Sequence, residues 1–417
     1  MLSHNDKKIL KNQIRHTLEL IENLEEKTGL IHLEKEIKHF FKERKFLGSR
    51  DRRFINNHVY AFFRWKGWVI KFESIDMLFI TSLLDTCFTE KSFAFFIEHP
   101  KTSITEEQAK EFSEFSIQKK ADFLAEHYKH PFTLENLIPS WLVSQIQTND
   151  LAQFIDANSK RALMWVRLQR TNKSQFLKIN PLQVIESPEH LPKCLAFEAN
   201  SSLDTLDSYK SGYFEIQDLG SQLITEICSP SSSEIWWDAC SGGGGKALAL
   251  AQQAKQVDAS DIRHFKLKEI EKRAKRGKIR NIHTFALDLL KQKNKNTYDG
   301  VLIDAPCSCS GTWRRRPSDR WKLTPSELSD IHYLQRNLLQ NASEAVNVGG
   351  TLVYATCSVL HSENEHIVEE FLEKNTHFSI VPFINPLDQT ETTGMLQLWP
   401  HIHLSDGMFM AKMVRNA

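Results

Sequence analysis

The second half of the chain alternates short apolar segments with longer charged ones, and this pattern constrains the fold more than any other feature. Five apolar segments each end near an acid, a cysteine or a glycine: EIWWDAC, KQVDASD, IHTFALD, DGVLIDAP and GGTLVYATCS. Helical patterns such as KALALAQQA, FKLKEIEKRAKR and HYLQRNLLQNASEAV separate them. Strands that alternate with helices form a mostly parallel, doubly wound sheet. We therefore expect a Rossmann-like α/β domain over residues 212–417, whose ligands bind at the carboxyl ends of its strands.

The rest of the chain predicts two further domains. Apolar residues recur at three- and four-residue spacing over residues 1–138, which predicts an all-helical domain. Over residues 139–211, ALMWVRLQR alternates apolar and polar residues like a half-buried strand, and KSQFLKINPLQ follows with a short helical pattern. This second segment predicts a small α+β module. A chain of 417 residues is long enough for three domains.

Composition excludes several classes of protein. The chain has 53 Lys+Arg and 52 Asp+Glu, so its net charge of +1 argues against a surface that is basic throughout, but not against a local basic groove. Seven unevenly spaced cysteines do not form a disulfide framework and indicate a reducing compartment. No apolar run approaches the roughly 18 residues of a membrane span, and the charged N-terminal segment is not a signal peptide. We expect a soluble cytoplasmic protein that does not bind membranes.

A glycine-rich loop, DACSGGGGK, follows the first apolar segment from Asp238 to Lys246. Its glycines leave the backbone amides open to a ligand. A phosphate-binding P-loop needs Ser or Thr after the lysine, whereas residue 247 is Ala247; a dinucleotide fold is not excluded by the loop alone. Asp261 ends the next strand about 20 residues on, where a carboxylate can bind ribose hydroxyls, and Asp288 ends the third strand, within reach of an adenine amino group. The set predicts a nucleoside cofactor without phosphates.

Two cysteines follow the ends of the fourth and fifth predicted strands. Cys307 lies three residues after Asp304 in DAPC, and Cys357 lies in ATCS, so both should face the cofactor edge of the sheet. Zinc is not expected, because the spacing of Cys307 and Cys309 is wrong and no companion pair exists. Two thiols beside an adenosine cofactor suit methylation of carbon 5 of a pyrimidine, since a thiolate that adds to carbon 6 makes carbon 5 nucleophilic. A second group then assists loss of the carbon 5 proton. The attacking thiol should have a pKa lowered by local positive potential.

These motifs resemble those of the RsmB-type (Sun or Fmu) ribosomal RNA cytosine-C5 methyltransferases. DACSGGGGK resembles the family's cofactor loop, DAPCSCSGTWRRRPSDRW its Pro-Cys motif, and TLVYATCSVLHSENE its Thr-Cys-Ser motif with the Glu-Asn tail. FEIQDLGSQ and DGMFMAKMVR resemble the segments that open and close the catalytic domain. Upstream, SRDRRFINNHVYAFFR looks like a NusB-type helical domain, and WVRLQRTN looks like the entry to the family's small RNA-binding module.

The resemblance implies a role for each matching residue. Cys357 would be the carbon 6 nucleophile, Cys307 would assist release of the product, and Asp304 would lie near both cofactor and base, with Lys246 close to the reacting base. The residues implied to hold S-adenosylmethionine come from the loop and the strand ends: Cys240, Ser241, Gly242, Gly243, Gly244, Gly245, Lys246, Asp261, Asp288 and Asp304. The family loop usually has Ala-Pro at positions 242 and 243. Glycine there keeps the backbone approachable but is costlier to order, so weaker cofactor binding is expected.

Basic segments are the candidates for RNA contact. Residues 264–280 are rich in Lys and Arg, and Trp313–Arg316 follows the Pro-Cys motif. Arginines bind phosphates and an aromatic ring stacks on a base, which must leave its stack for carbon 6 to be reached. The alternative for each segment is a solvated surface. The second module offers three more candidates, namely Arg167, Arg170 and Lys173.

Together, these features predict an S-adenosylmethionine-dependent RNA cytosine-C5 methyltransferase of small-subunit (16S) ribosomal RNA. We expect a monomer without a metal ion. Two alternatives remain open: a transfer RNA target, and a non-catalytic RNA-binding ribosome-assembly factor with the same fold. The altered glycine loop is the only support for the latter. The NusB-like segment favours ribosomal RNA, by analogy.

Overall fold

The computed structural model describes residues 2–98 and 104–416, which belong to two compact units. One, the helical unit, comprises Met1–Lys160 and Trp313–Pro325. The other, the sheet unit, comprises Arg161–Thr312 and Ser326–Ala417. Among the described residues, no helix combines the length and the apolar composition needed to cross a membrane.

The helical unit contains helices and no strand within its described residues. The helices are α1 (His4–Glu25), α2 (Leu33–Glu43), α3 (Ser49–Val69), α4 (Ser74–Leu84), α5 (Glu90–Phe96), α6 (Glu106–Ser113), α7 (Ile117–Tyr128), α8 (Ser140–Val143), α9 (Leu151–Asn158) and α15 (Asp319–Lys322), with the 3-10 turn η1 (Leu134–Leu137). Helix α3 packs against α1 and α4, and its apolar face, which includes Val59, Phe62 and Phe63, is fully buried. Thr105 and Gln108 form a capping box that fixes the start of α6. The helices predicted over residues 1–138 are confirmed for residues 2–98 and 104–138, and residues 1 and 99–103 lie outside the described residues.

The segment Trp313–Pro325 packs inside the helical unit, and this corrects one prediction. Trp313 is fully buried, with its ring centroid 6.2 Å from that of Phe154. Trp321 Nε1 donates to the carbonyl of Phe63 at 2.6 Å. Trp313 therefore cannot stack on a displaced base, and Arg314 is also buried. The predicted RNA contact of these two residues is wrong because their side chains anchor the segment; for Arg315 and Arg316 it stays a prediction.

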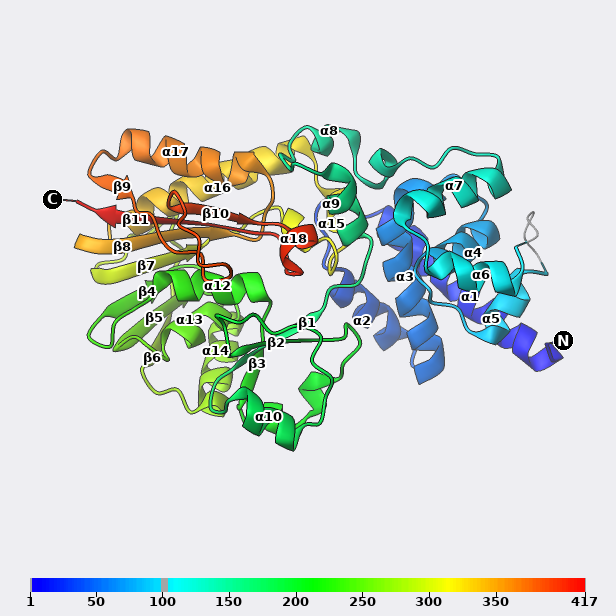
Figure 1. Ribbon diagram of the computed structural model, residues 1–417, viewed down its shortest axis with the longest axis horizontal. Helices are drawn as coiled ribbons and strands as arrows, with labels where there is room; N and C mark the ends of the chain where they lie inside the picture. The colour runs from blue at the N-terminus through cyan, green and yellow to red at the C-terminus, as the bar shows by residue number, and fades with distance from the viewer. Residues whose placement is uncertain (1, 99–103, 417) are drawn as a thin grey trace. The chain divides into compact units, whose positions relative to one another are not determined.

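The large sheet of the sheet unit is mostly parallel, as predicted. Its strands are β4 (Ile235–Asp238), β5 (Gln256–Asp261), β6 (Ile282–Ala286), β7 (Tyr298–Asp304), β8 (Val346–Thr356), β9 (Phe378–Ile380), β10 (Met395–Leu398) and β11 (Met408–Arg415). Their order is β10-β11-β8-β7-β4-β5-β6, with β9 paired to β11 (Figure 1). Strands β4 to β8 pair in parallel, and β11 pairs antiparallel with β8, β9 and β10. The chain order reverses between β4 and β7, where a ligand crevice forms in such sheets.

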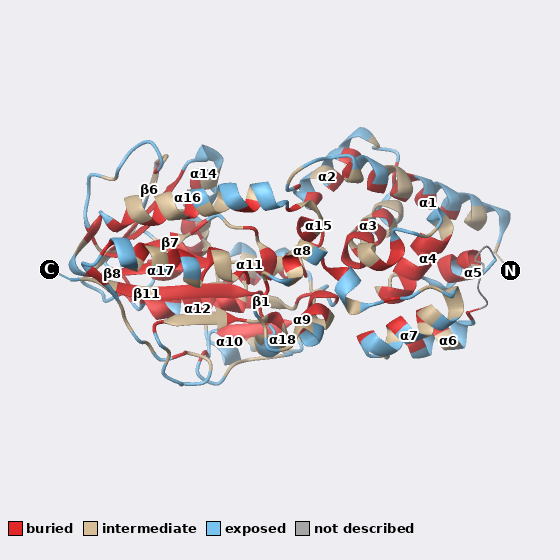
Figure 2. Cartoon of the chain, turned by 90° about the horizontal axis from the view of Figure 1, so that it is seen from above, coloured by how far each residue is buried: buried red, intermediate tan, exposed pale blue. Residues whose placement is uncertain are grey.

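Helices cover both faces of this sheet. On one face pack α12 (Leu219–Cys228), α13 (Gly245–Leu250) and α14 (His264–Gly277); on the other pack α16 (Pro325–Ser343) and α17 (Glu365–Lys374). Because side chains alternate along a strand, Trp236 enters the first core and Trp237 the second. Figure 2 shows β11 buried along most of its length. Burial on both faces explains the continuous apolar runs of these strands.

A second, antiparallel sheet of three strands precedes the large one. It has the order β2-β1-β3, from β1 (Met164–Leu168), β2 (Cys194–Phe197) and β3 (Phe214–Ile216), and is accompanied by α10 (Lys173–Ile179) and α11 (Asp207–Lys210). Arg167 in β1 is only 4% exposed and donates to Gln217 Oε1 at 2.8 Å. Burial lowers the pKa of its guanidinium to about 10. Arg167 is therefore an internal residue, and its predicted contact with phosphate is wrong. Arg170 and Lys173 are exposed.

Candidate active site

The carboxyl ends of the parallel strands bring the predicted site residues to one edge of the sheet. Asp238 ends β4, Asp261 ends β5 and Asp304 ends β7, while Cys357 follows the last residue of β8. Strands β7, β4 and β5 are direct neighbours. Since parallel strands end at a common edge, residues far apart in the sequence share one site.

The glycine loop between β4 and α13 is pinned at its start and open at its centre. Ser241 donates to the carbonyl of Ser260 through both its backbone amide and its hydroxyl, each at 2.9 Å. Gly244 has φ +78°, and a Cβ there would lie 2.7 Å from Cγ1 of Ile270, so only glycine fits. Gly242 has φ +52°, and a Cβ there would meet nothing within 4 Å. The loop therefore leaves open space beside Gly242 that a ligand can enter.

Asp261 carries an ionised carboxylate at the rim of this loop. The backbone amide of Gly242 donates to Oδ2 at 3.0 Å, and Arg263 donates to both oxygens through its backbone and side-chain nitrogens at 2.8–2.9 Å. Burial raises the pKa of Asp261, but the bonds from Arg263 outweigh it and hold the pKa below its usual value. A ribose at this carboxylate would share it with Arg263, a residue that the sequence did not single out.

Asp288 lies two residues beyond β6 and has local partners. Its Oδ1 accepts from the backbone amide of Leu290 at 3.2 Å, and its Oδ2 pairs with Lys291 at 3.1 Å. The side chain closes the turn that follows the strand. Its role toward adenine stays a prediction.

Asp238, Asp304 and Lys246 form a charged cluster in which Asp238 and Lys246 are buried and Asp304 is partly exposed. Lys246 Nζ lies 2.6 Å from Asp304 Oδ2. Burial lowers the pKa of Lys246, but the charge of Asp304 and their hydrogen bond raise it further, so the ammonium form is favoured. Asp238 is fully buried. Burial, with the negative charge of Asp304, raises the pKa of Asp238 to about 7. The sequence indicated Lys246 and Asp304 but not the titration of Asp238.

Three thiols, rather than two, meet at the other side of the site. The Sγ atoms of Cys307 and Cys357 are 3.3 Å apart. With Cys309, all three sulfur atoms lie within 4.8 Å of one another, close enough to share a thiophilic metal ion. Cys309 has φ +58°, a left-handed conformation that turns its thiol back toward the carbonyl of Cys307. The sequence indicates Cys309 only through its spacing from Cys307, which does not match a zinc motif. The absence of a metal ion from this site stays a prediction.

The pKa values of these thiols correct a third prediction. Hydrogen bonds with Cys309 and Cys357, together with burial, raise the pKa of Cys307 well above its usual value. For Cys357, the hydrogen bond with Cys307 lowers the pKa, but the bond with Cys309, burial and the charge of Asp304 raise it far more. The expected lowering of the Cys357 pKa is therefore wrong. The physical reason is that a half-buried cluster of mutually hydrogen-bonded thiols beside the negative charge of Asp304 disfavours a thiolate, while the ammonium of Lys246 pairs with Asp304.

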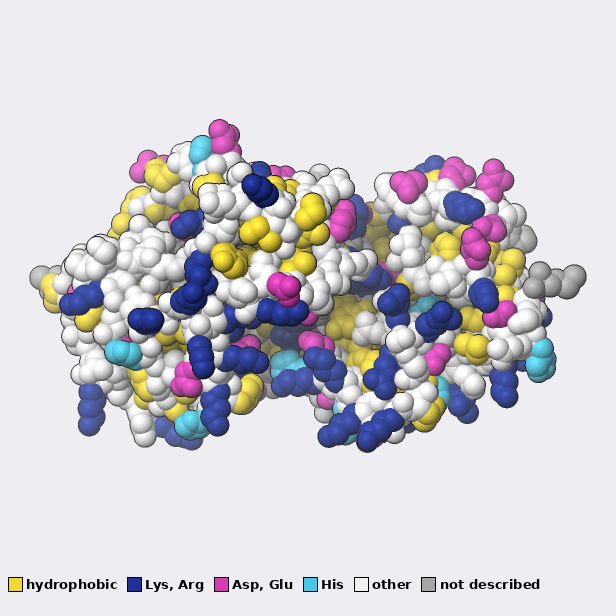
Figure 3. All heavy atoms as spheres, turned by 90° about the horizontal axis from the view of Figure 1, so that it is seen from below, with side chains coloured by type: hydrophobic (Ala, Val, Ile, Leu, Met, Phe, Trp, Pro, Cys, Tyr) yellow, Lys and Arg dark blue, Asp and Glu magenta, His cyan; other side chains and the backbone are white. Residues whose placement is uncertain are grey.

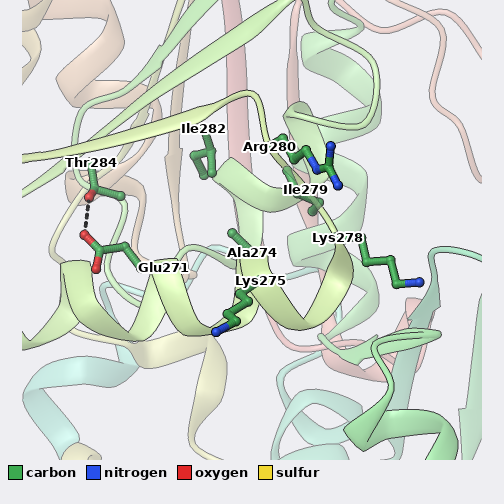
Figure 4. A pocket seen from close by; sticks show the side chains of 8 residues that line it. All are labelled: Glu271, Ala274, Lys275, Lys278, Ile279, Arg280, Ile282 and Thr284. Atoms are coloured by element: carbon green, nitrogen blue, oxygen red, sulfur yellow. Dashed lines mark hydrogen bonds between the residues drawn. The ribbon is translucent and has the colours of Figure 1, made fainter.

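The basic helix α14 is partly committed to internal contacts. Arg273 and Arg276 both pair with the buried carboxylate of Glu215 in β3. The carboxyl end of α14 and the start of β6 line a pocket of about 430 Å³, where Figure 4 shows Lys275, Lys278 and Arg280. The face drawn in Figure 3 carries many Lys and Arg side chains, with Asp and Glu among them. RNA contact by the other basic residues of α14 stays a prediction. Arg273 and Arg276 are left out of that prediction because their side chains pair with Glu215.

The chain is similar to known methyltransferases. Residues 225–414 match the family model of the 16S rRNA methyltransferase RsmB/F. Ribosomal RNA small subunit methyltransferase B of Pectobacterium carotovorum is 28% identical over 318 residues, which cover 72% of this chain and 69% of that protein. A probable ribosomal RNA small subunit methyltransferase B of Synechocystis is 32% identical over 268 residues, which cover 58% of this chain and 60% of that protein.

Two solved structures share the fold. The crystal structure of PH0851 has a TM-score of 0.73 at 23% identity and covers 99% of this chain and 100% of its own. The structure of NSun6 from Pyrococcus horikoshii with SFG has a TM-score of 0.58 at 18% identity and covers 67% of this chain and 97% of its own. At these identities the likeness concerns the fold alone.

Proposed function

We propose that the chain, whose residues 225–414 match the family model of the 16S rRNA methyltransferase RsmB/F, is a member of that family and methylates carbon 5 of a cytosine in small-subunit ribosomal RNA. The observation that carries the proposal is the pair of thiols of Cys307 and Cys357, 3.3 Å apart at the carboxyl edge of the sheet. Neither direct methylation of a nitrogen nor that of an oxygen requires two thiols. Methylation of carbon 5 requires a nucleophile at carbon 6 and benefits from a second group at release.

The residues of the strand-end edge fit S-adenosylmethionine, which when bound supplies a methyl group activated by a positively charged sulfonium. Open space beside Gly242 admits a ligand to the loop. The ionised carboxylate of Asp261 suits ribose hydroxyls. The full set proposed to hold the cofactor is Cys240 to Lys246, Asp261, Asp288 and Asp304.

Cys357 is proposed to attack carbon 6 of the target cytosine. Because its pKa is raised, the thiol loses its proton as the bond to carbon 6 forms, rather than beforehand. Asp304, whose negative charge raises the pKa of that thiol, is proposed to accept the proton. The developing thiolate also attracts the ammonium of Lys246, since the charge of Cys357 raises the pKa of this lysine. Attack at carbon 6 makes carbon 5 the nucleophile toward the methyl group.

Cys307 is proposed to assist release of the methylated base. After transfer, the proton on carbon 5 must leave before the bond from carbon 6 to Cys357 can break. At 3.3 Å, the Cys307 thiol is within reach of the Cys357 sulfur for proton exchange. Loss of Cys307 should therefore trap the protein on RNA.

The remaining segments are proposed to hold the RNA. We assign residues 1–138 to a NusB-like domain, residues 139–211 to a small α+β RNA-binding module and residues 212–417 to the catalytic domain. Exposed Arg170 and Lys173 support RNA contact by the module. The protein is proposed to act as a monomer without a metal ion.

Bisulfite mapping of ribosomal and transfer RNA, from cells with and without this protein, tests the target. The proposal expects one or more 5-methylcytosines of 16S ribosomal RNA to disappear with the protein. Loss confined to transfer RNA would support the alternative substrate. No change in either RNA, together with no binding of S-adenosylmethionine, would support a non-catalytic assembly factor.

A further inference from the structure

One buried carboxylate outside the proposed catalytic set connects the two loops that carry the thiols. Glu363 ends the 3-10 turn η4 (His361–Glu363), and its side chain is fully buried. Its Oε1 accepts from the backbone amide of Ser308 at 2.8 Å and from Gln335 Nε2 at 3.1 Å. Its Oε2 accepts from the hydroxyls of Ser308 and Ser358. The two oxygens thus receive four hydrogen bonds.

The donors flank the thiols in the sequence. Ser308 lies between Cys307 and Cys309, and Ser358 directly follows Cys357. Gln335 also donates to the carbonyl of Pro306 at 3.0 Å, which adds a second tie to the residue before Cys307. A single side chain is therefore bonded to the neighbour of each thiol.

Burial of the Glu363 carboxyl group costs free energy of folding, so its four hydrogen bonds are unlike those of a chance surface contact. Burial raises the pKa of Glu363, and its hydrogen bonds with Ser308, Ser358 and Gln335 lower it in part. A buried carboxyl group is retained at such a cost only when its partners are well placed. The bonds also hold Ser308 beside Cys309, whose left-handed backbone needs support from its surroundings.

We propose that Glu363 is a positioning residue that holds the Pro-Cys loop and the Thr-Cys loop in register, and so sets the distance between the Cys307 and Cys357 thiols. It touches neither reacting thiol and acts through Ser308 and Ser358. The expected effect of Glu363 on the rate of methyl transfer rests on the proposed function. Its expected effect on the distance between the two thiols does not. The geometric consequence can be measured without RNA or cofactor.

Replacement of Glu363 with Gln tests the inference with little change of shape. An amide nitrogen in place of either carboxylate oxygen would face donors, because Oε1 and Oε2 both accept two hydrogen bonds. At least one of the hydrogen bonds that connect the two loops to residue 363 must then be lost. Glu369→Gln is the matched control, since Glu369 is an exposed residue of α17 nearby in the sequence.

Dibromobimane, which becomes fluorescent when it bridges two close thiols, reports the geometry. In a background with Cys309→Ser, we expect Glu363→Gln to slow bridging of Cys307 and Cys357 by about tenfold or more, and Glu369→Gln to change it less than about twofold. Monobromobimane should label Cys357 of a Cys307→Ala protein, as measured on the Cys357 peptide by mass spectrometry, at the same rate with and without Glu363→Gln. Equal bridging rates in Glu363→Gln and the control would overturn the inference.

Kinetics supply the second readout. Glu363→Gln should lower kcat for methyl transfer by about 100-fold and leave KM for S-adenosylmethionine within about threefold, because the glycine loop is not touched. If Glu363→Gln does not fold, Ser308→Ala and Ser358→Ala each remove one tie, and either should slow bridging. Unchanged bridging in both serine variants would also reject the inference. If the wild-type chain methylates no RNA, the proposed function fails while the bridging result still decides the role of Glu363.

Discussion

Asp238→Asn is the change whose consequence for stability follows most directly from the structure. Asp238 is fully buried at the end of β4. Burial and the negative charge of Asp304 raise its pKa from 3.8 to about 7, although Lys246 and the backbone amides of Cys240 and Ala247 lower it in part. The folded chain therefore binds a proton at Asp238 more tightly than the unfolded chain does.

The sign and size of the effect follow from this difference. For a carboxyl whose pKa is raised on folding, stability is lost as the pH rises from the unfolded pKa to the folded one. A shift of about three pKa units at about 1.4 kcal/mol per unit amounts to about 4 kcal/mol above pH 7. Between about pH 5 and about pH 8 the wild-type chain should lose about 3 kcal/mol of this contribution, whereas the asparagine side chain of the variant has no proton to lose.

Urea unfolding, followed by tryptophan fluorescence at both pH values, measures the difference. We expect the free energy of unfolding of the variant, relative to wild type, to rise by about 3 kcal/mol from about pH 5 to about pH 8. Asp261→Asn is the control, because Arg263 holds the pKa of Asp261 below its usual value of 3.8, so this carboxylate is largely ionised in both the folded and the unfolded chain from about pH 5 upwards. The free energy of unfolding of this variant, relative to wild type, should therefore stay constant between about pH 5 and about pH 8. A relative free energy for Asp238→Asn that stays constant within about 1 kcal/mol would refute the reasoning.

Three further substitutions test the proposed chemistry. Cys357→Ala should lower methyl transfer at least about 1,000-fold, with the Kd for S-adenosylmethionine within about twofold by calorimetry; retained activity would reject the nucleophile. Cys307→Ala should accumulate a covalent protein–RNA adduct that survives a denaturing gel, and continued turnover without an adduct would exclude the release role. Lys246→Met should slow methyl transfer by about 100-fold. It should also lower the free energy of unfolding by about 2 kcal/mol, because Asp304 loses its partner but is partly exposed; an unchanged rate and stability would show that the pair is dispensable.

The strand ends could be predicted from the sequence because each strand is recognised from a short apolar run, without knowledge of distant residues. Strands β5 and β7 end at Asp261 and Asp304, and Cys357 directly follows β8. Because parallel strands share an edge, the sequence alone predicts that these three residues lie in one site. The glycine loop was likewise evident from its composition. These features fixed the fold class and most of the candidate site.

Errors arose where burial depends on distant parts of the chain. Trp313 and Arg314 have the local pattern of an RNA contact, but the structure buries Trp313 against Phe154, more than a hundred residues earlier. Arg167 is enclosed because Gln217, on a later segment, accepts its hydrogen bond. The raised pKa of Cys357 depends on Cys309, whose left-handed backbone no spacing rule indicates. The positioning role proposed for Glu363 could not be predicted from the sequence for the same reason. Its four hydrogen-bond donors come from three segments that are separate in the sequence.

Mass spectrometry of the trapped protein–RNA complex tests the central claim most directly. The Cys307→Ala protein would be incubated with 16S ribosomal RNA and S-adenosylmethionine, then digested with protease and nuclease. We predict a peptide containing Cys357 linked through sulfur to carbon 6 of a methylated cytosine. A link to Cys309, or methyl transfer to RNA with no link to any cysteine, would contradict the account.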